Sequence, residues 1–391
     1  MSFVSGIGRR RAMQLLLGLV APLLAACEPS AFGTGPSINP ARPVPVALLV
    51  PGGSESPGDN VIAENLINAA RLAASDLEGA AIDLRIYNTA GDAATAASLA
   101  QQAVNDGARI ILGPVFAESA AAAAAAVAAR NVNVLAFSNN PAVAGGNLFV
   151  LGPTFRNTAD RLTGYAVAQG RRKILIIHGE DAAERAGRDA IEAAIARRGA
   201  TLAGISSFEL SQEGVIAAMR DISTAVRDSG AEAIFLTSGT SGALPFLAQL
   251  LPENGIDPEE IRYMGLQRWD IPASALTLPG LQNGWFALPD PELNDNFKAR
   301  YAAAYGNSPH PIAGLAYDGI AAIGALVAQG RSNALTREAL TQEAGFIGVN
   351  GVFRLLPDGT NQRGLAVATI QNNQVVIIDP APRSFGSGAG A

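Results

Sequence analysis

Few side chains in this 391-residue sequence have the types and spacing that enzyme or metal chemistry needs. The two histidines, His178 and His310, stand far apart in the chain, and Cys27 is the single cysteine. A nucleophile triad or a His/Cys metal centre needs more such residues. Lys173 and Lys298 are the only lysines, and neither lies in a phosphate-binding loop or follows a serine by three residues. We therefore expect no enzyme, no metal and no cofactor.

The charge of the chain argues against binding to nucleic acid. The sequence has 28 basic and 34 acidic side chains, a net charge of −6, and both signs are spread along it without a basic stripe. Hydrophobic residues make up 49% of the chain, which excludes a disordered protein. The length predicts about two domains.

The first 27 residues have the order of a bacterial export signal. Arginines at 9–11 precede an apolar run, 15–26, of about 12 residues, which is too short to cross a bilayer. Leu24-Ala25-Ala26-Cys27 resembles the lipobox, whose cysteine is lipidated and becomes the mature N-terminus. We expect a signal peptide at 1–26 and a lipid anchor on Cys27, and Glu28 after it favours the outer membrane. The alternative is a buried N-terminal helix that ends in an incidental cysteine, and either the general or the twin-arginine export route remains open.

The rest of the chain alternates strands and helices after a short tether. Residues 27–43 are rich in Pro, Gly and Ser and lack periodicity, so we expect them to be flexible. From residue 44 onward, short β-branched and aliphatic runs alternate with longer helical segments. This pattern predicts an α/β fold with mainly parallel sheets flanked by helices. A second series of this kind begins near Asn157, which indicates two lobes, and the Gly/Ser-rich end at 381–391 is expected to be disordered.

Several short motifs follow one another in a specific order. They are Val50-Pro51-Gly52-Gly53, Gly113-Pro114, Phe137-Ser138-Asn139-Asn140 and Tyr317-Asp318-Gly319. This order resembles the type I periplasmic binding proteins of the leucine-binding group, over residues 45–379. A second set looks similar to lipoproteins known as penicillin-binding protein activators: Trp269-Asp270, Gly284-Trp285-Phe286 and Pro289-Asp290-Pro291. The resemblance implies two lobes joined by a three-stranded hinge.

Within this fold, we assign the first lobe to 44–152 plus about 291–345, and the second lobe to 153–290 plus about 346–380. Ligands of open α/β sheets bind beyond the carboxyl ends of the strands, so the loops there are expected to line the cleft. The candidate cleft residues are Ser54, Phe116, Ser119, Ser138, Asn139 and Asn140 from the first lobe, and Asp181, Thr240, Gln267, Trp269 and Asp270 from the second.

An amino-acid ligand would place different demands on the two lobes. Its carboxylate needs hydroxyls and backbone N–H groups at a helix start, which Ser119 and Ser138 could frame. Ser119 is equally suited to capping its own helix, and Asn139 and Asn140 to a turn. Trp269 is either a stacking platform in the cleft or a residue that seals the lobe.

The second lobe departs from the amino-acid-binding relatives. Those relatives have an aromatic residue near the position of Glu184 and a carboxylate near Gln267-Arg268, which meets the ligand's ammonium. Because an arginine does not pair with an ammonium, the resemblance implies an altered clamp, unless Asp181 or Asp270 substitutes. His178 is more typical of a structural residue than of a ligand contact.

Two functions remain open. The first is a lipoprotein that activates a peptidoglycan synthase (a penicillin-binding protein), and the altered clamp favours it, because a regulator needs no solute. The alternative is the substrate-binding component of an ABC importer for amino acids or amides, with an ABC permease as its partner. Either protein would contact the membrane only through its lipid anchor.

Overall fold

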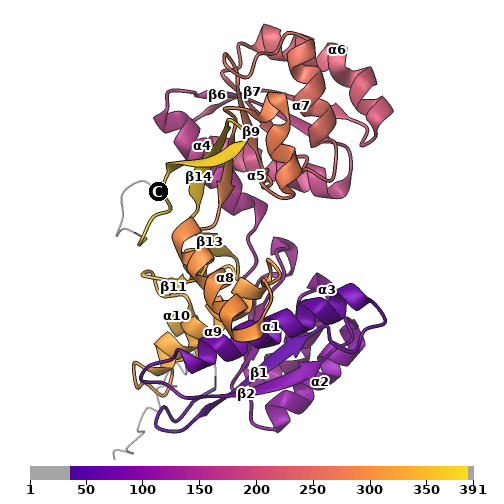
Figure 1. Cartoon of the computed structure of the whole chain (residues 1–391). Helices are drawn as coiled ribbons and strands as arrows, with labels where there is room; N and C mark the ends of the chain where they lie inside the picture. The colour runs from indigo at the N-terminus through magenta and orange to yellow at the C-terminus, as the bar shows by residue number, and fades with distance from the viewer. Residues whose placement is uncertain (1–35, 386–391) are drawn as a thin grey trace, which may run out of the picture. The chain divides into compact units, whose positions relative to one another are not determined.

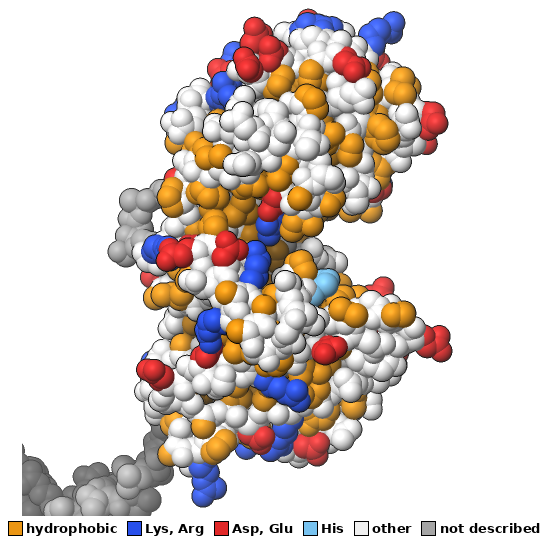
Figure 2. Space-filling model, viewed as in Figure 1, with side chains coloured by type: hydrophobic (Ala, Val, Ile, Leu, Met, Phe, Trp, Pro, Cys, Tyr) orange, Lys and Arg blue, Asp and Glu red, His pale blue; other side chains and the backbone are white. Residues whose placement is uncertain are grey.

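The computed structural model describes residues 36–385, which belong to the compact unit that begins at Gly33. The predicted signal peptide, Cys27 and most of the predicted tether lie outside the described residues. No helix within 36–385 combines the length and the apolar character that a membrane span requires. On the face shown in Figure 2, basic and acidic side chains are interspersed, as their spacing in the sequence indicates.

The first sheet is parallel and has the strand order β2-β1-β3-β4-β5. Its strands are β1 (Val44–Val50), β2 (Ile82–Asn88), β3 (Ile110–Leu112), β4 (Asn133–Ala136) and β5 (Leu148–Val150). In β1, Val46 pairs with Leu84 on one side and Ile110 on the other. Because helices cover both of its faces, this central strand is apolar at nearly every position.

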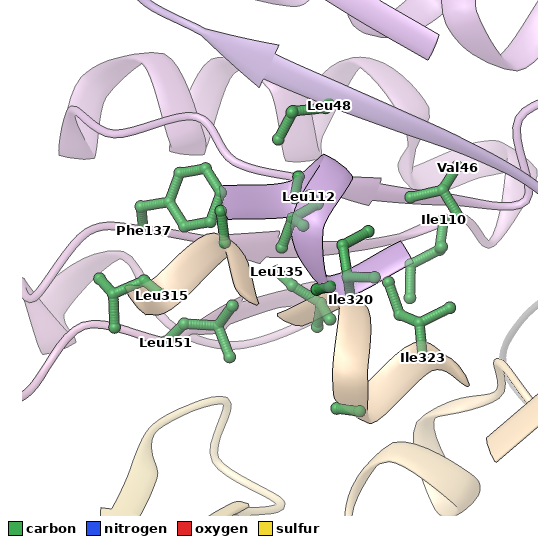
Figure 3. Packing of buried hydrophobic residues seen from close by; sticks show 14 of the residues in the cluster. Val46, Leu48, Ile110, Leu112, Leu135, Phe137, Leu151, Leu315, Ile320 and Ile323 are labelled. Carbon is green, nitrogen blue, oxygen red and sulfur yellow. The ribbon is translucent and has the colours of Figure 1, made fainter. Parts of the chain in front are cut away.

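Side chains of alternating position along β1 enter two different cores. Val46 and Leu48 face helices α1 (Pro57–Ser75) and α9 (Ala313–Val327), whereas Ala47 and Leu49 face the other side. Figure 3 shows the first of these cores, where Ile320 and Ile323 of α9 pack on the sheet. The opposite face is covered by α2 (Ala93–Asn105) and α3 (Ala117–Val127) (Figure 1). Two further helices complete this part, α8 (Pro291–Tyr305) and α10 (Arg337–Leu340).

The second sheet is mixed and has the strand order β15-β14-β10-β9-β8-β6-β7. Its strands are β6 (Lys173–Gly179), β7 (Thr201–Phe208), β8 (Ala233–Leu236), β9 (Arg262–Gly265), β10 (Trp285–Leu288), β14 (Ala366–Gln371) and β15 (Gln374–Asp379). Only β14 and β15 run antiparallel to their neighbours. One face packs against α4 (Phe155–Ala168) and α5 (Ala182–Arg197), and the other against α6 (Gln212–Ser229) and α7 (Leu244–Glu253). Short 3₁₀ helices are η1 (Ala128–Arg130), η2 (Pro141–Val143), η3 (Ala273–Thr277) and η4 (Pro279–Leu281).

A third, antiparallel sheet contains β11 (Phe346–Gly348), β12 (Gly351–Leu355) and β13 (Asn361–Arg363). Phe346 and Phe353 of this sheet are buried in the core shared by α1 and α9. We predicted that the second lobe resumes at about residue 346, whereas these side chains pack with the first sheet, and the second sheet resumes only at β14. The sequence shows no local signal for this, because the packing partners are distant in the chain.

Within residues 36–385, the chain passes three times between the elements around the first sheet and those of the second. The passages join β5 to α4, β10 to α8, and β13 to β14. The predicted fold, two α/β lobes with mainly parallel sheets joined by several strands of chain, is therefore confirmed.

Candidate functional site at the carboxyl ends of the strands

The start of α3 is the clearest place for an anionic group on the first lobe. The helix begins at Ala117, directly after the loop that leaves β3, and no side chain among the described residues caps its N-terminus. By contrast, the neighbouring α2 is capped by Asp92, whose Oδ1 accepts a hydrogen bond from the Thr95 N–H at 2.7 Å. The first N–H groups of α3 thus remain available, and the positive end of the helix dipole adds to them. This arrangement suits a carboxylate.

Ser119 lies in the first turn of α3, but its hydroxyl is already used. The side chain is 1% exposed, and its Oγ donates to the Gly91 carbonyl at 3.1 Å. The serine therefore ties α3 to the loop after β2 and neither caps its own helix nor has a proton left for a carboxylate. The sequence suggested two roles for this hydroxyl, binding a ligand carboxylate or capping α3, and the observed contact is neither of them.

Ser138 has the hydroxyl that remains free. Its buried Oγ accepts a hydrogen bond from the Asn140 N–H at 3.2 Å, and among the described residues it donates to no acceptor. The loop that carries it runs beside the start of α3, since the Phe137 N–H donates to the Pro114 carbonyl at 2.9 Å. Ser138 can therefore donate to an anion near that helix start.

The other candidates of the first lobe shape the same edge. Asn140 accepts from the Ala142 N–H at 2.9 Å, which is a turn-forming role, while Asn139 is exposed. Ser54 donates to Asp59 at 2.9 Å and so orders the loop after β1. Phe116, just before α3, keeps 38% of its surface exposed. An apolar ring therefore stands beside the proposed carboxylate position.

On the second lobe, Glu184 in the first turn of α5 holds together the ends of two strands. Its carboxylate is 7% exposed and accepts from the Gly179 N–H at 3.2 Å, from Ser238 Oγ at 2.8 Å and from Thr237 Oγ1. A carboxylate satisfied in this way is not free for a ligand ammonium. The sequence marks Glu184 only as a departure from the relatives, since its two hydroxyl partners follow β8, about 50 residues away.

The remaining polar candidates of the second lobe are also engaged with the protein. Asp181 caps α5 by accepting from the Glu184 N–H at 2.7 Å, and Asp270 pairs with Arg268, with Nε–Oδ1 at 2.9 Å. Thr240 Oγ1 donates to the Ile271 carbonyl at 2.6 Å, and Gln267 Nε2 donates to the Thr237 carbonyl at 3.2 Å. None of these groups presents an unpaired, buried carboxylate within the described residues.

Trp269 is buried and has no surface to offer a ligand in this structure. Its exposure is 0%, and its ring lies 5.8 Å from that of Phe286, centroid to centroid. A Cβ at Gly265 or Gly284 would overlap the indole, so both glycines make room for it. This position corresponds to the sealing role, the second of the two considered from the sequence.

The two histidines do not form a reactive group. His178 is 4% exposed, and its Nδ1 hydrogen-bonds the Gly179 carbonyl at 2.7 Å, while burial lowers the pKa of the distant His310. Within 36–385, no three His, Cys, Asp or Glu side chains lie together as a metal site would require. What the edge can do is bind an anion.

Solved structures with a similar fold include proteins named as parts of ABC transporters. A putative branched-chain amino acid ABC transporter from Rhodospirillum rubrum aligns with a TM-score of 0.73 and 17% identity, over 86% of this chain and 100% of that one. An ABC transporter substrate-binding protein from Desulfitobacterium hafniense in complex with Leu gives 0.62 and 16%, over 86% and 100%. A solute-binding protein from R. palustris in complex with benzoate gives 0.56 and 15%, over 88% and 98%. At these identities the likeness concerns the fold.

No curated protein matches the sequence. The periplasmic binding protein family, however, matches residues 43–374, which is nearly the whole of the described chain. The matched segment includes the first sheet, the strands of the second sheet except β15, and the three passages between them. The chain therefore belongs to the periplasmic binding protein family.

Proposed function

We propose that the protein is the substrate-binding component of an ABC importer for small carboxylates. The observation that carries the proposal is the uncapped start of α3 beside the free hydroxyl of Ser138. Backbone N–H groups, a helix dipole and one hydroxyl donor together recognise a carboxylate without a basic side chain. The solved structures of this fold that are named as ABC transporter proteins support an ABC permease as the partner.

The second lobe favours ligands without an ammonium group. At this edge, the Glu184 carboxylate accepts from Thr237 and Ser238, and the Asp270 carboxylate pairs with Arg268. Asp181 caps α5, and Glu180 accepts from Ser207 Oγ at 2.9 Å. Exposed apolar side chains occur in the loops instead, namely Leu210 after β7 at 40% and Ile271 after β9 at 46%. Together with Phe116, they suit a ligand that has an apolar body and a carboxylate at one end.

The alternative is an activator of a penicillin-binding protein, which the lipid anchor, the altered clamp and the motifs Trp269-Asp270 and Gly284-Trp285-Phe286 favour. The aromatic residues of these motifs, Trp269, Trp285 and Phe286, lie in the core of the second lobe. Their packing accounts for their identity without a partner protein. A regulator that needs no solute remains the outcome to expect if no carboxylate binds.

A matched pair of solutes tests the proposal directly. The mature protein is titrated calorimetrically with leucine and with 4-methylpentanoate, which is leucine without its amino group, and 4-methylpentanamide serves as the uncharged control. We expect 4-methylpentanoate to bind at least as tightly as leucine and the amide not to bind. A carboxylate at about 1,000 times its Kd adds about 4 kcal/mol to the free energy of unfolding, so thermal shifts extend the screen to other acids. Failure of every carboxylate, with crosslinking to a cell-wall synthase in cells, would establish the regulator instead.

The proposed location is the periplasm, with a lipid on Cys27 as the anchor. The family is periplasmic, and the order of residues 9–27 is that of a lipoprotein signal. Replacing Cys27 with Ser should move the protein from the membrane fraction to the soluble periplasmic fraction. Retention of that variant on membranes would refute the anchor but leave solute binding untouched.

A further inference from the structure

A pocket of about 750 Å³ lies apart from the edge around α3. Its walls come from α4, the end of α5, the β12–β13 region and the segment that follows β15. Six arginines and two aspartates line it, a surplus of four positive charges in a chain whose net charge is −6. The arginines are Arg156, Arg161, Arg197, Arg198, Arg354 and Arg363.

Three of these arginines have structural partners. Arg363 pairs with the buried Asp318, and Arg161 binds Asp379 Oδ2 at 2.8 Å and the Leu365 carbonyl at 2.7 Å. Arg197 pairs with Asp160 at 2.8 Å. Their charges are therefore largely balanced within the protein.

The other three arginines have weaker acidic partners or none. Arg198 has no hydrogen-bond or ionic partner among residues 36–385, and its Nε lies against Gly164 of α4. Arg354 hydrogen-bonds the Gln362 amide oxygen at 2.8 Å and lies 4.8 Å from the ring centre of Phe385, but it meets no acid. Arg156 reaches two carboxylates at longer range: Asp160 Oδ2 at 3.5 Å, whose other oxygen Arg197 binds, and Asp358 Oδ2 at 3.9 Å.

Apolar groups complete the lining. The pocket is also lined by Tyr165, Leu356 and Phe385. Its volume falls in the range of small-molecule sites, about 300–1,000 Å³. Planar guanidinium groups bind carboxylates and phosphates in a bidentate manner. The pocket thus combines planar cations that are only partly paired with aromatic surface.

We infer that this pocket binds a small aromatic or planar dianion, with its acidic groups on Arg198, Arg354 and Arg156 and its body against Tyr165 and Phe385. None of these residues belongs to the edge around α3, so the site is separate from the proposed solute site. The walls include Gly364 and Leu365, which join β13 to β14, and the first turns of α4, which follow β5. A bound dianion therefore contacts two of the passages that connect the sheets.

Calorimetry of the mature protein with two probes tests the site: phthalate, an aromatic dicarboxylate, and phenyl phosphate. We expect 1:1 binding of at least one probe with a Kd below 1 mM, weakened by salt, and no binding of the uncharged phthalamide. Binding of phthalate alone or of phenyl phosphate alone decides whether the natural ligand is a dicarboxylate or a phosphate ester.

Two pocket variants and two control variants assign the binding to the pocket. Arg198→Gln with Arg354→Gln should weaken binding at least tenfold, whereas Arg220→Gln, which alters an exposed arginine outside the pocket, should not. Ala168→Trp fills the exposed rim of the pocket without touching an arginine and should also abolish binding. Ser138→Ala should leave the Kd of these probes unchanged even where it reduces solute binding. The inference would be overturned if neither probe binds at 10 mM. It would also be overturned if wild type, the double arginine variant and Ala168→Trp all have the same Kd.

Discussion

Asp318 of α9 and Arg363 of β13 form an ion pair that is almost completely buried. The distance from Nη1 to Oδ2 is 3.1 Å, and the side chains are 4% exposed for the arginine and 0% for the aspartate. Asp318 also accepts from the Val349 N–H at 2.8 Å and from Asn350 Nδ2 at 3.1 Å, while Arg363 Nε donates to the Leu151 carbonyl at 3.1 Å. The pair therefore joins α9, the β11–β12 turn, β13 and the chain that leaves β5.

Two asparagines continue this network along the passages between the sheets. Asn361 donates to the carbonyls of Val150 and Gly152 at 2.8 and 2.9 Å, and its own carbonyl accepts from Asn157 Nδ2 at 3.0 Å. The passages from β5 to α4 and from β13 to β14 are thus bonded to each other. Their relative position depends on a few buried polar groups rather than on apolar packing alone.

Asp318→Asn should be strongly destabilising. The substitution leaves the Arg363 guanidinium buried without a counter-charge, which typically costs about 3–5 kcal/mol of the free energy of unfolding. Urea unfolding measured by circular dichroism gives this quantity. Arg220→Ala breaks the exposed pair with Asp221 and should leave the urea midpoint nearly unchanged.

A double variant separates loss of the pair from loss of packing. Asp318→Leu with Arg363→Met removes both charges, so it should be much less destabilising than the sum of the two single changes. Additive effects would mean that the two charges do not stabilise each other.

Ser138→Ala and Ser119→Ala should have opposite consequences. The Ser138 hydroxyl is free to donate, so its loss should raise the Kd for a bound carboxylate about tenfold, with little change in stability, since a hydrogen bond to a charged group contributes about 1.5–3 kcal/mol. The Ser119 hydroxyl donates to the Gly91 carbonyl, so its loss should lower the free energy of unfolding by about 1 kcal/mol. Calorimetric titration of both variants measures the effect on binding, and urea unfolding measures the effect on stability. A larger binding defect in Ser119→Ala than in Ser138→Ala would contradict the assignment of Ser138 as the ligand donor.

The fold could be predicted from the sequence because its main signals are local. The apolar run of β1 and the spacing of the apolar residues of α2 depend on neighbouring residues. β10 is also apolar, but its run of four residues between Gly284 and Pro289 is too short for periodicity to identify a strand. The polar β13 has no local signal, because Asn361 and Arg363 are buried by partners more than 40 residues away.

The candidate site could be predicted as a set of loops but not as a set of contacts. The carboxyl ends of the strands indicate which loops to consider, and Ser119 and Ser138 were both selected in this way. Which hydroxyl is free depends on Gly91 and Asn140, and no pattern in the sequence records the direction of an O–H bond. The sequence likewise does not decide whether Trp269 is exposed or buried, because this depends on the space that Gly265 and Gly284 leave for its ring.

Trp269→Ala should act on stability, because the ring fills the core of the second lobe. Truncation of a fully buried aromatic side chain typically costs about 3–5 kcal/mol. Trp269→Phe should be milder, because the indole Nε1 has no hydrogen-bond partner among the described residues and its removal relieves a buried unpaired donor. Urea unfolding of both variants measures these effects. A stable Trp269→Ala protein with weakened solute binding would restore the role of a stacking platform.

Asp76 should make the stability of the first lobe depend on pH. It follows α1 and accepts from Tyr317 of α9 at 2.6 Å and from Arg300 of α8, so it links three helices. Burial alone would raise the pKa of Asp76, but the hydrogen bonds from Arg300 and Tyr317 outweigh burial and hold this pKa below its ordinary value.

A folded-state pKa below the unfolded value means that Asp76 stabilises the protein above the unfolded pKa, about 3.9, and that this contribution is lost as the pH falls through the folded value. Asp76→Asn should therefore lower the free energy of unfolding at pH 7, and its difference from wild type should shrink steadily below about pH 5. Tyr317→Phe removes one of the two hydrogen bonds, so it should shift the pKa of Asp76 part of the way back, as followed by NMR of the carboxyl carbon. If the difference between Asp76→Asn and wild type stays constant from pH 7 to pH 3, the three-helix link does not depend on the charge of Asp76.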